Sequence, residues 1–183
     1  MAGRGAVTCR AVLSIGGNQG DSLALLRGVV HRAAEDRILR AVSSAYATPP
    51  WGGVEQEDFL NAVLVVEHPG SPMDVLEWGF AREREADRVR EVRWGPRTLD
   101  VDVVAAEVDG EPVTSEDQTL TLPHPRAAER AFVLVPWLEI EPGALLHGIR
   151  VSDHLAALED RDAGAVGAVR RLDEPLAPAG WAT

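Results

Sequence analysis

Residues 93–104 read RWGPRTLDVDVV, and the second half of this stretch places two acids inside an apolar run. Successive side chains of a β-strand point to opposite faces, so the leucine and valines share one face while Asp100 and Asp102 share the other. Two carboxylates this close repel each other unless a cation lies beside them. The pattern therefore predicts a half-buried strand whose polar face holds either an arginine or a divalent metal ion.

The elements that precede this strand decide the fold class. From the amino terminus we expect a strand over 9–15, a helix over 22–36, strands over 38–47 and 58–67, a helix over 72–87, and then the strand that starts at Leu99. Asn18 to Asp21 have the residues of a turn and helix cap, and Ser71 and Pro72 those of a helix start. The order βαββαβ predicts an α+β fold, the ferredoxin-like sandwich, with antiparallel strands and both helices on one face of the sheet.

The last third of the chain is less patterned. It contains a hairpin signal at Asp109-Gly110, the segment LPHPRAAERAFVLVPW at 122–137, and a short helix near 152–159. Residues 1–172 are expected to form a single domain. Residues 173–183 are rich in proline and alanine and are expected to be a loosely ordered tail.

Composition excludes several classes of protein. All 18 basic residues are arginine, which excludes every mechanism that needs a catalytic or phosphate-binding lysine. The formal net charge of -11 argues against binding nucleic acid through its phosphates. We find no signal peptide and no apolar run of membrane-spanning length, so we expect a cytoplasmic protein without membrane partners. A single cysteine, Cys9, cannot form an internal disulfide.

Against this acidic background, residues 82–97 hold six arginines and four acids, a local charge of +2. Such an island suggests a small anionic ligand such as a phosphate, although a solvated helix face has the same composition. Glu83 and Asp87 fall close to the apolar stripe marked by Leu76 and Phe80 on the same predicted helix. Either the helix leaves the core at this end or its acids contribute to a site, and both interpretations stay open.

Aromatic and polar residues occur together in two further segments. Phe59 and Asn61 are two apart in a predicted strand, so a ring and an amide point the same way, as a flat heterocycle would require. The second segment supplies His124, Arg130 and Phe132. A core phenylalanine and a loop-stabilising histidine are the alternatives. Combined with the acid pair and the arginines, these residues favour metal-dependent phosphoryl transfer to a heterocyclic substrate.

These stretches together resemble the 6-hydroxymethyl-7,8-dihydropterin pyrophosphokinase family of folate biosynthesis, whose members move the terminal diphosphate of ATP onto a pterin hydroxymethyl group and release AMP. The resemblance covers roughly residues 10–150. It rests on GGNQGD at 16–21, TPP at 48–50, FLNA at 59–62, RVREVRWGPRTLDVD at 88–102 and LPHPRAAERAFVL at 122–134. Gly17 and Asp87 depart from the family pattern, which usually has serine and glycine at these positions. The family fold is ferredoxin-like, in agreement with the element order.

The resemblance implies a role for each matching residue. Asp100 and Asp102 would bind two magnesium ions that bridge the ATP phosphates, and with Arg88 and Arg97 they would be the catalytic residues. The implied ATP contacts are Glu83, Arg88, Arg90, Arg93, Trp94, Arg97, His124 and Arg130. The implied pterin contacts are Thr48, Pro49, Pro50, Trp51, Phe59, Asn61 and Phe132, with the pterin stacked between the two phenylalanines.

Three expectations follow for partners and alternatives. The ligands would be ATP with Mg²⁺ and 6-hydroxymethyl-7,8-dihydropterin, bound by a monomer. A nucleotidyltransferase with the same acid pair, or a non-catalytic ferredoxin-like ligand-binding domain, are the rival functions. We expect Asp102 to serve metal, so that Asp102→Asn leaves the metal-free protein stable but inactive. If it pairs with an arginine such as Arg97, the same change should destabilise it.

Overall fold

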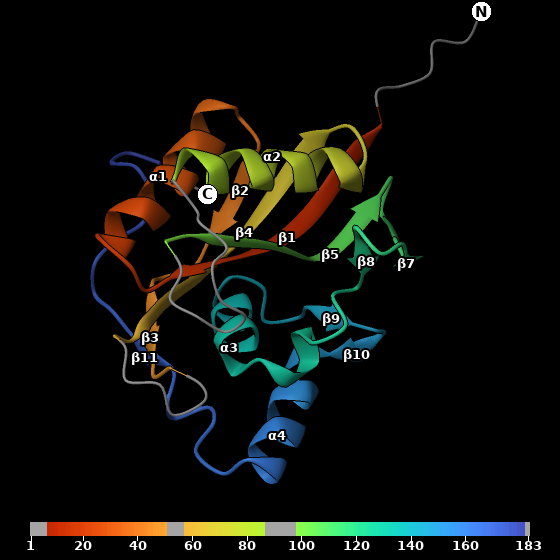
Figure 1. Ribbon diagram of the computed structural model, residues 1–183. Coiled ribbons are helices and arrows are strands. Elements are labelled where there is room, and N and C mark those ends of the chain that lie inside the picture. Colours follow the sequence, from red (N-terminus) through yellow and green to blue (C-terminus); the bar gives the residue numbers. More distant parts are fainter. Residues whose placement is uncertain (1–6, 51–56, 87–97, 182–183) are drawn as a thin grey trace, which may run out of the picture.

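The structure is a computed structural model that describes residues 7–50, 57–86 and 98–181. Helices α1 and α2 lie on one side of the main sheet, and α3 and α4 lie on the other (Figure 1). In chain order the elements are β1 (Thr8–Gly17), α1 (Ser22–Glu35), β2 (Leu39–Val42), β3 (Tyr46–Thr48), β4 (Phe59–Pro69), α2 (Pro72–Glu85), β5 (Asp100–Val108), β6 (Glu111–Pro112), β7 (Ser115–Glu116), β8 (Thr121–Leu122), the 3₁₀ turn η1 (Ala127–Glu129), α3 (Ala131–Ile140), β9 (Leu145–Leu146), β10 (Ile149–Arg150), α4 (Val151–Arg161) and β11 (Arg170–Arg171).

The main sheet has the order β11-β3-β4-β1-β5-β6, and β2 pairs with β4 on the same side as β3. Strand β1 is antiparallel to both of its neighbours, β4 and β5. The connection from β1 through α1 to β2 therefore passes over β4, and the connection from β4 through α2 to β5 passes over β1. This is the split βαβ arrangement, so the predicted ferredoxin-like fold is confirmed.

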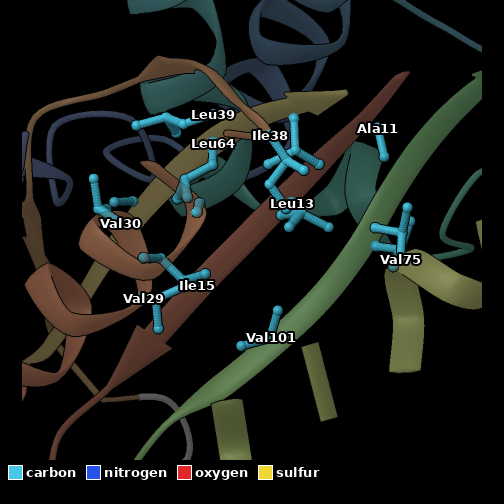
Figure 2. Close-up of a cluster of buried hydrophobic side chains, with 14 of the residues drawn as sticks. Ala11, Leu13, Ile15, Val29, Val30, Ile38, Leu39, Leu64, Val75 and Val101 are labelled. Carbon is cyan, nitrogen blue, oxygen red and sulfur yellow. The ribbon is translucent and has the colours of Figure 1, made fainter. Parts of the chain in front are cut away.

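The first hydrophobic core lies between the sheet and helices α1 and α2 (Figure 2). Leu13 and Ile15 of β1 point into it, as do Val30 of α1, Val75 of α2 and Val101 of β5. The two-residue period along β1 and β5 puts these side chains on one face. Val101 is 2% exposed, which confirms the predicted apolar face of the strand that carries the acids.

The first two predicted helices begin where their capping residues indicate. The Asp21 carboxylate accepts a hydrogen bond from Ala24 N at 3.0 Å at the start of α1. Ser71 and Asp74 form a reciprocal capping box at the start of α2, with Pro72 in its first turn. Each helix ends slightly earlier than predicted. Among the described residues, no helix is long and apolar enough to cross a membrane.

The strand predicted over 38–47 is divided into β2 and β3. Serine side chains cause the interruption, because their hydroxyl groups compete with the backbone ladder. Ser43 Oγ accepts a hydrogen bond from Val63 N at 2.9 Å, and Ser44 donates its backbone N–H and its hydroxyl to the Glu139 carboxylate. A single continuous strand was therefore the wrong prediction here.

Helix α3 covers the second face of the sheet and was not predicted. Its sequence, AFVLVPWLEI, is apolar almost all round and contains Pro136, so it shows neither helical amphipathicity nor an uninterrupted set of N–H donors. Val133 and Trp137 pack with Val104 of β5 in a second hydrophobic cluster. The helix thereby fixes the position of Arg130, the residue that immediately precedes it.

Two other predictions for the last third, the hairpin turn and the short helix, agree with the structure. Asp109 and Gly110 adopt positive φ angles of 54° and 83° in the turn that joins β5 to β6. Two successive positive φ angles are the conformation for which an Asp-Gly pair is suited. The short helix expected near 152–159 is α4, which covers Val151–Arg161.

The carboxyl-terminal segment packs more closely than its composition suggests. Strand β11 pairs with β3 at the edge of the main sheet. Leu176 is 2% exposed and belongs to the first hydrophobic core. Arg27 Nε donates a hydrogen bond to Pro175 O at 3.0 Å. One buried leucine therefore holds part of the expected loose tail against α1, a feature that proline and alanine content does not reveal.

Candidate active site

The acid pair of β5 lies on the face of the sheet opposite α1 and α2. Val101 between the two acids points into the first core, so Asp100 and Asp102 point to the other side. Both acids are partly exposed. In the register with β1, Asp100 is opposite Gly16 and Asp102 is opposite Ser14.

Among the described residues, Arg130 is the arginine paired with this acid pair. Its Nη1 donates a hydrogen bond to Asp102 Oδ2 at 2.8 Å, with side-chain exposures of 21% for the arginine and 31% for the aspartate. The guanidinium carbon also lies 5.7 Å from the centre of the Phe132 ring, within cation–π range. Arg130 thus neutralises one of the two carboxylates. The arginines at 88–97, among them the Arg97 considered as a partner, lie outside the described residues.

His124 approaches the same carboxylate oxygen, with Nε2 at 3.9 Å from Asp102 Oδ2. Its Nδ1 accepts a hydrogen bond from Arg126 N at 3.1 Å, so the proton of the neutral ring belongs on Nε2 and faces the acid. Burial lowers the pKa of His124, and the Arg130 charge lowers it further against the opposing effect of Asp102. The backbone N–H of His124 donates to Val104 O at 2.8 Å, which ties this segment to β5.

A polar and aromatic group lies on the same face, two strands away. Asn61 of β4 donates from Nδ2 to Thr48 Oγ1 of β3 at 2.9 Å, and both residues are buried. Phe59 lies two residues earlier on β4, directly opposite Thr48 in the ladder. Pro49, which is exposed, and Pro50, which is partly buried, follow β3. The predicted ring and amide are therefore brought together, and the partner of the amide is the Thr48 hydroxyl.

Gly16 of β1 lies between the acid pair of β5 and the amide and ring of β4. The sequence did not predict it to be a site residue. It is paired with Asn61 of β4 on one side and with Asp100 of β5 on the other. A Cβ at this position would lie 2.7 Å from Asn61 Oδ1, closer than side chains pack. The strand was expected to end at residue 15, but Gly16 and Gly17 also belong to β1. Asn61 and Asp100 are two strand spacings apart, each of about 4.8 Å. Gly16, which lies between them, has no side chain to fill this surface.

Glu83 lies in the core between α2 and β5, and its expected contact with the nucleotide stays a prediction. It is 5% exposed, and its Oε1 accepts a hydrogen bond from Val101 N at 2.9 Å. It therefore contacts the backbone of β5 between the two acids. Phe132, at the start of α3, packs against the second hydrophobic cluster. Stacking of a pterin between Phe132 and Phe59 stays a prediction.

Six of the expected site residues lie outside the described residues: Trp51, Arg88, Arg90, Arg93, Trp94 and Arg97. Asp87, one of the two departures from the family pattern, also lies outside them. The described part of the site therefore consists of the acid pair with its arginine and histidine, and the amide with its threonine and ring.

The donor set of the acid pair suits a magnesium ion. Within the described ranges, no group of three or more His, Cys, Asp or Glu side chains could hold a metal ion. Two carboxylates on one strand face instead match the way Mg²⁺ binds, with one or two carboxylates completed by water and substrate phosphates. Oxygen donors also favour Mg²⁺ over zinc, which prefers nitrogen and sulfur ligands.

Comparison with known proteins places this arrangement in a family. The sequence model of 7,8-dihydro-6-hydroxymethylpterin-pyrophosphokinase (HPPK) matches residues 12–142. The chain belongs to the HPPK family. The matched region runs from β1 to the end of α3 and so includes every strand that carries a described site residue.

Curated HPPK relatives are similar over most of their length. The Mycobacterium tuberculosis 2-amino-4-hydroxy-6-hydroxymethyldihydropteridine pyrophosphokinase is 48% identical over 143 residues, covering 75% of either chain. The Methylorubrum extorquens protein of the same name is 44% identical over 152 residues, which cover 82% of this chain and 94% of the relative. The Bacillus subtilis protein is 39% identical over 133 residues, which cover 71% and 77%.

A solved structure supports the HPPK fold independently. The Plasmodium falciparum HPPK-DHPS crystal structure with pteroate superposes with a TM-score of 0.62 at 12% sequence identity, and the match covers 90% of this chain. The chain spans about half of that longer protein, 46% of its length. At this identity the likeness concerns the fold alone.

Proposed function

We propose that the protein is a folate-biosynthesis kinase that transfers the β,γ-diphosphate of ATP to the hydroxymethyl group of 6-hydroxymethyl-7,8-dihydropterin and releases AMP. Membership of the HPPK family and the names of relatives at 39% to 48% identity support this assignment. The observation that carries it is the alignment of Asn61, Gly16 and Asp100 on three neighbouring strands. A hydrogen-bonding amide at one end and a carboxylate pair at the other suit a polar heterocycle beside a metal-bound phosphate.

Asp100 and Asp102 would hold Mg²⁺ together with the ATP phosphates, and we propose two ions. When bound, magnesium neutralises charge that develops on the phosphate oxygens during transfer. Arg130 would exchange its bond with Asp102 for one with a phosphate oxygen. An arginine is suited to this exchange because its planar guanidinium binds carboxylates and phosphates with the same geometry.

The pterin would lie over the Gly16 backbone, with Asn61 and Thr48 hydrogen-bonding its polar edge and Phe59 and Phe132 stacking on its faces. Its hydroxyl oxygen attacks the β-phosphorus while the bond from that phosphorus to the oxygen of the α-phosphate breaks. The hydroxyl proton passes to a base, and AMP leaves. Because little covalent chemistry is asked of the protein, positioning and charge stabilisation would provide most of the rate enhancement.

We propose that the remaining expected ATP contacts, Arg88, Arg90, Arg93, Trp94 and Arg97, complete the phosphate site together with His124. Their place in the sequence supports this, because Arg97 at the end of this segment is only three residues before Asp100, where β5 begins. Pro50 and Trp51 would border the pterin. A monomer in the cytoplasm remains the proposed state.

Incubation with ATP, Mg²⁺ and 6-hydroxymethyl-7,8-dihydropterin, followed by chromatography of the nucleotides, tests the proposal. AMP formation that depends on both the pterin and Mg²⁺ is expected. Release of pyrophosphate with AMP attached to the acceptor would instead indicate a nucleotidyltransferase. Binding of the pterin without any ATP turnover would indicate a ligand-binding domain.

A further inference from the structure

We propose that Glu83 is a positioning residue that sets the geometry of the acid pair by holding the β5 backbone between the two acids. The proposal rests on the proposed function, because its importance depends on Asp100 and Asp102 binding metal. Glu83 is carried by α2, on the opposite side of the sheet from the acid side chains. Its carboxylate oxygen lies 2.9 Å from Val101 N, and the residue is 5% exposed.

The amide of Val101 needs such a partner because of its place in the sheet. Strand β5 pairs with β1 along one edge, whereas β6 pairs with its other edge only near Glu107 and Val108 within the described residues. Val101 N is buried, and a buried N–H without a hydrogen-bond acceptor is costly. Glu83 supplies the acceptor at the end of β5 that carries the acids.

A second contact joins the same helix to the same residue. A Cβ on Gly79 would lie 2.9 Å from Val101 Cγ1, so the absence of a side chain allows α2 to approach β5 closely at this point. Gly79 and Glu83 are four residues apart and therefore on the same face of α2. The helix thus contacts Val101 twice, once at its side chain and once at its backbone N–H.

A hydrogen bond that holds the Val101 backbone in place also restricts the positions of Asp100 and Asp102 on either side of it. Asp100 and Asp102 are joined to it by planar peptide groups, and their side chains leave the opposite face of the strand. A displacement of the Val101 backbone would therefore move both carboxylates relative to Arg130 and to any metal ion. Groups that orient metal ligands in this indirect way typically affect metal affinity about tenfold to a hundredfold.

The hydrogen bond to Val101 N requires an acceptor oxygen at position 83, and an uncharged oxygen can also accept it. Glu83→Gln keeps a side-chain oxygen for Val101 N, and Glu83→Leu has similar volume without that oxygen.

Mn²⁺ affinity should be measured by paramagnetic resonance with an ATP analogue whose α and β phosphorus atoms are joined by a methylene group. Amide exchange at Val101, followed by NMR, reports on the hydrogen bond itself. We expect Glu83→Leu to weaken Mn²⁺ binding about tenfold to a hundredfold and to accelerate Val101 exchange, and Glu83→Gln to resemble the unmodified protein.

Two results would overturn the proposal. Equal loss of Mn²⁺ affinity in both variants would mean that the charge of Glu83 acts directly on the nucleotide or metal. A lower melting temperature with unchanged Mn²⁺ affinity in Glu83→Leu would leave only a structural role. If Glu83→Leu does not fold, Gly79→Ala decides: it should accelerate Val101 exchange and weaken Mn²⁺ binding, whereas Gly28→Ala on α1, with nothing within 4 Å, should change neither. Product analysis of the unmodified protein tests the proposed function separately.

Discussion

At the scale of single residues, the contact between Asp102 and Arg130 decides how the acid pair behaves without metal. The 2.8 Å hydrogen bond pairs one acid with a fixed cation, so the strand does not depend on metal alone to offset the repulsion. Contrary to the expectation from the sequence, Asp102→Asn should therefore lower the free energy of unfolding in EDTA. We expect a loss of about 1 kcal/mol, because the side chains keep partial contact with water and the asparagine oxygen still accepts from Arg130.

A double-mutant cycle measures this pairing. Chemical denaturation in EDTA of Asp102→Asn, Arg130→Met and the double variant should yield a coupling energy of about 1 kcal/mol. The pair of distant surface substitutions Glu116→Gln and Arg161→Met serves as the additive control. Additive effects of Asp102→Asn and Arg130→Met, or a gain in stability from Asp102→Asn alone, would show that the two side chains do not stabilise each other.

Gly16 carries a second prediction at this scale. Gly16→Ala would place a methyl group against Asn61 Oδ1, and the displaced amide would lose its bond with Thr48. Pterin affinity should fall about tenfold or more, since one hydrogen bond left unmade in a buried site costs about 1 to 3 kcal/mol. Calorimetry should show little change for ATP. Gly143→Ala, whose new methyl group would have nothing within 4 Å, should alter neither affinity. Equal weakening of both ligands would contradict the assignment of this surface to the pterin.

At the scale of elements, α3 is tied to the β2–β3 connection by one carboxylate. Glu139 accepts hydrogen bonds from Ser44 and, at 3.1 Å, from the hydroxyl of Tyr46. Burial, followed by the charge of Glu139, raises the pKa of Tyr46 to about 12 from 10.0. The folded state then holds the phenol proton more tightly than the unfolded state. This contribution to stability is complete below about pH 10 and is lost as the pH rises through 12.

Because the chain has one tyrosine, the ultraviolet absorbance of its phenolate reports on Tyr46 directly. Titration should give a pKa well above the ordinary value, and Glu139→Gln should lower it by removing the neighbouring negative charge. Glu116→Gln, an exposed acid on β7, should leave the titration unchanged. A Tyr46 pKa that does not respond to Glu139→Gln would show that α3 is not held to this part of the sheet in the described way.

The elements also show what could be predicted from sequence. Alternation in β5 and the caps of α1 and α2 are local signals, and they located these elements to within a few residues. Helix α3 was missed because a helix buried in a core has no polar face to produce a period. Arg130 and Asp102 were both identified as site residues, but their pairing depends on how α3 packs, over a separation of 28 residues. No local pattern contains that information.

At the scale of the whole molecule, the sheet brings distant segments into one site. Asn61, Gly16 and Asp100 come from three strands and are aligned by the antiparallel register alone. Thr48 of β3 is opposite Phe59 and contacts Asn61 diagonally. The role of Glu83 in contacting Val101 could not be foreseen from sequence for a related reason. Its position on α2 suggested either the core or the site, and only the close approach of α2 to β5 at Gly79 shows that it links the two.

The most direct test of the central claim is a phosphorus NMR spectrum of the products formed from ATP, Mg²⁺ and 6-hydroxymethyl-7,8-dihydropterin. The proposed function predicts AMP and a pterin that carries two phosphorus atoms coupled to each other, because the β,γ-diphosphate is transferred intact. Asp102→Asn should form these products at a rate lower by orders of magnitude. ADP together with a pterin that carries a single phosphorus atom would contradict the claim.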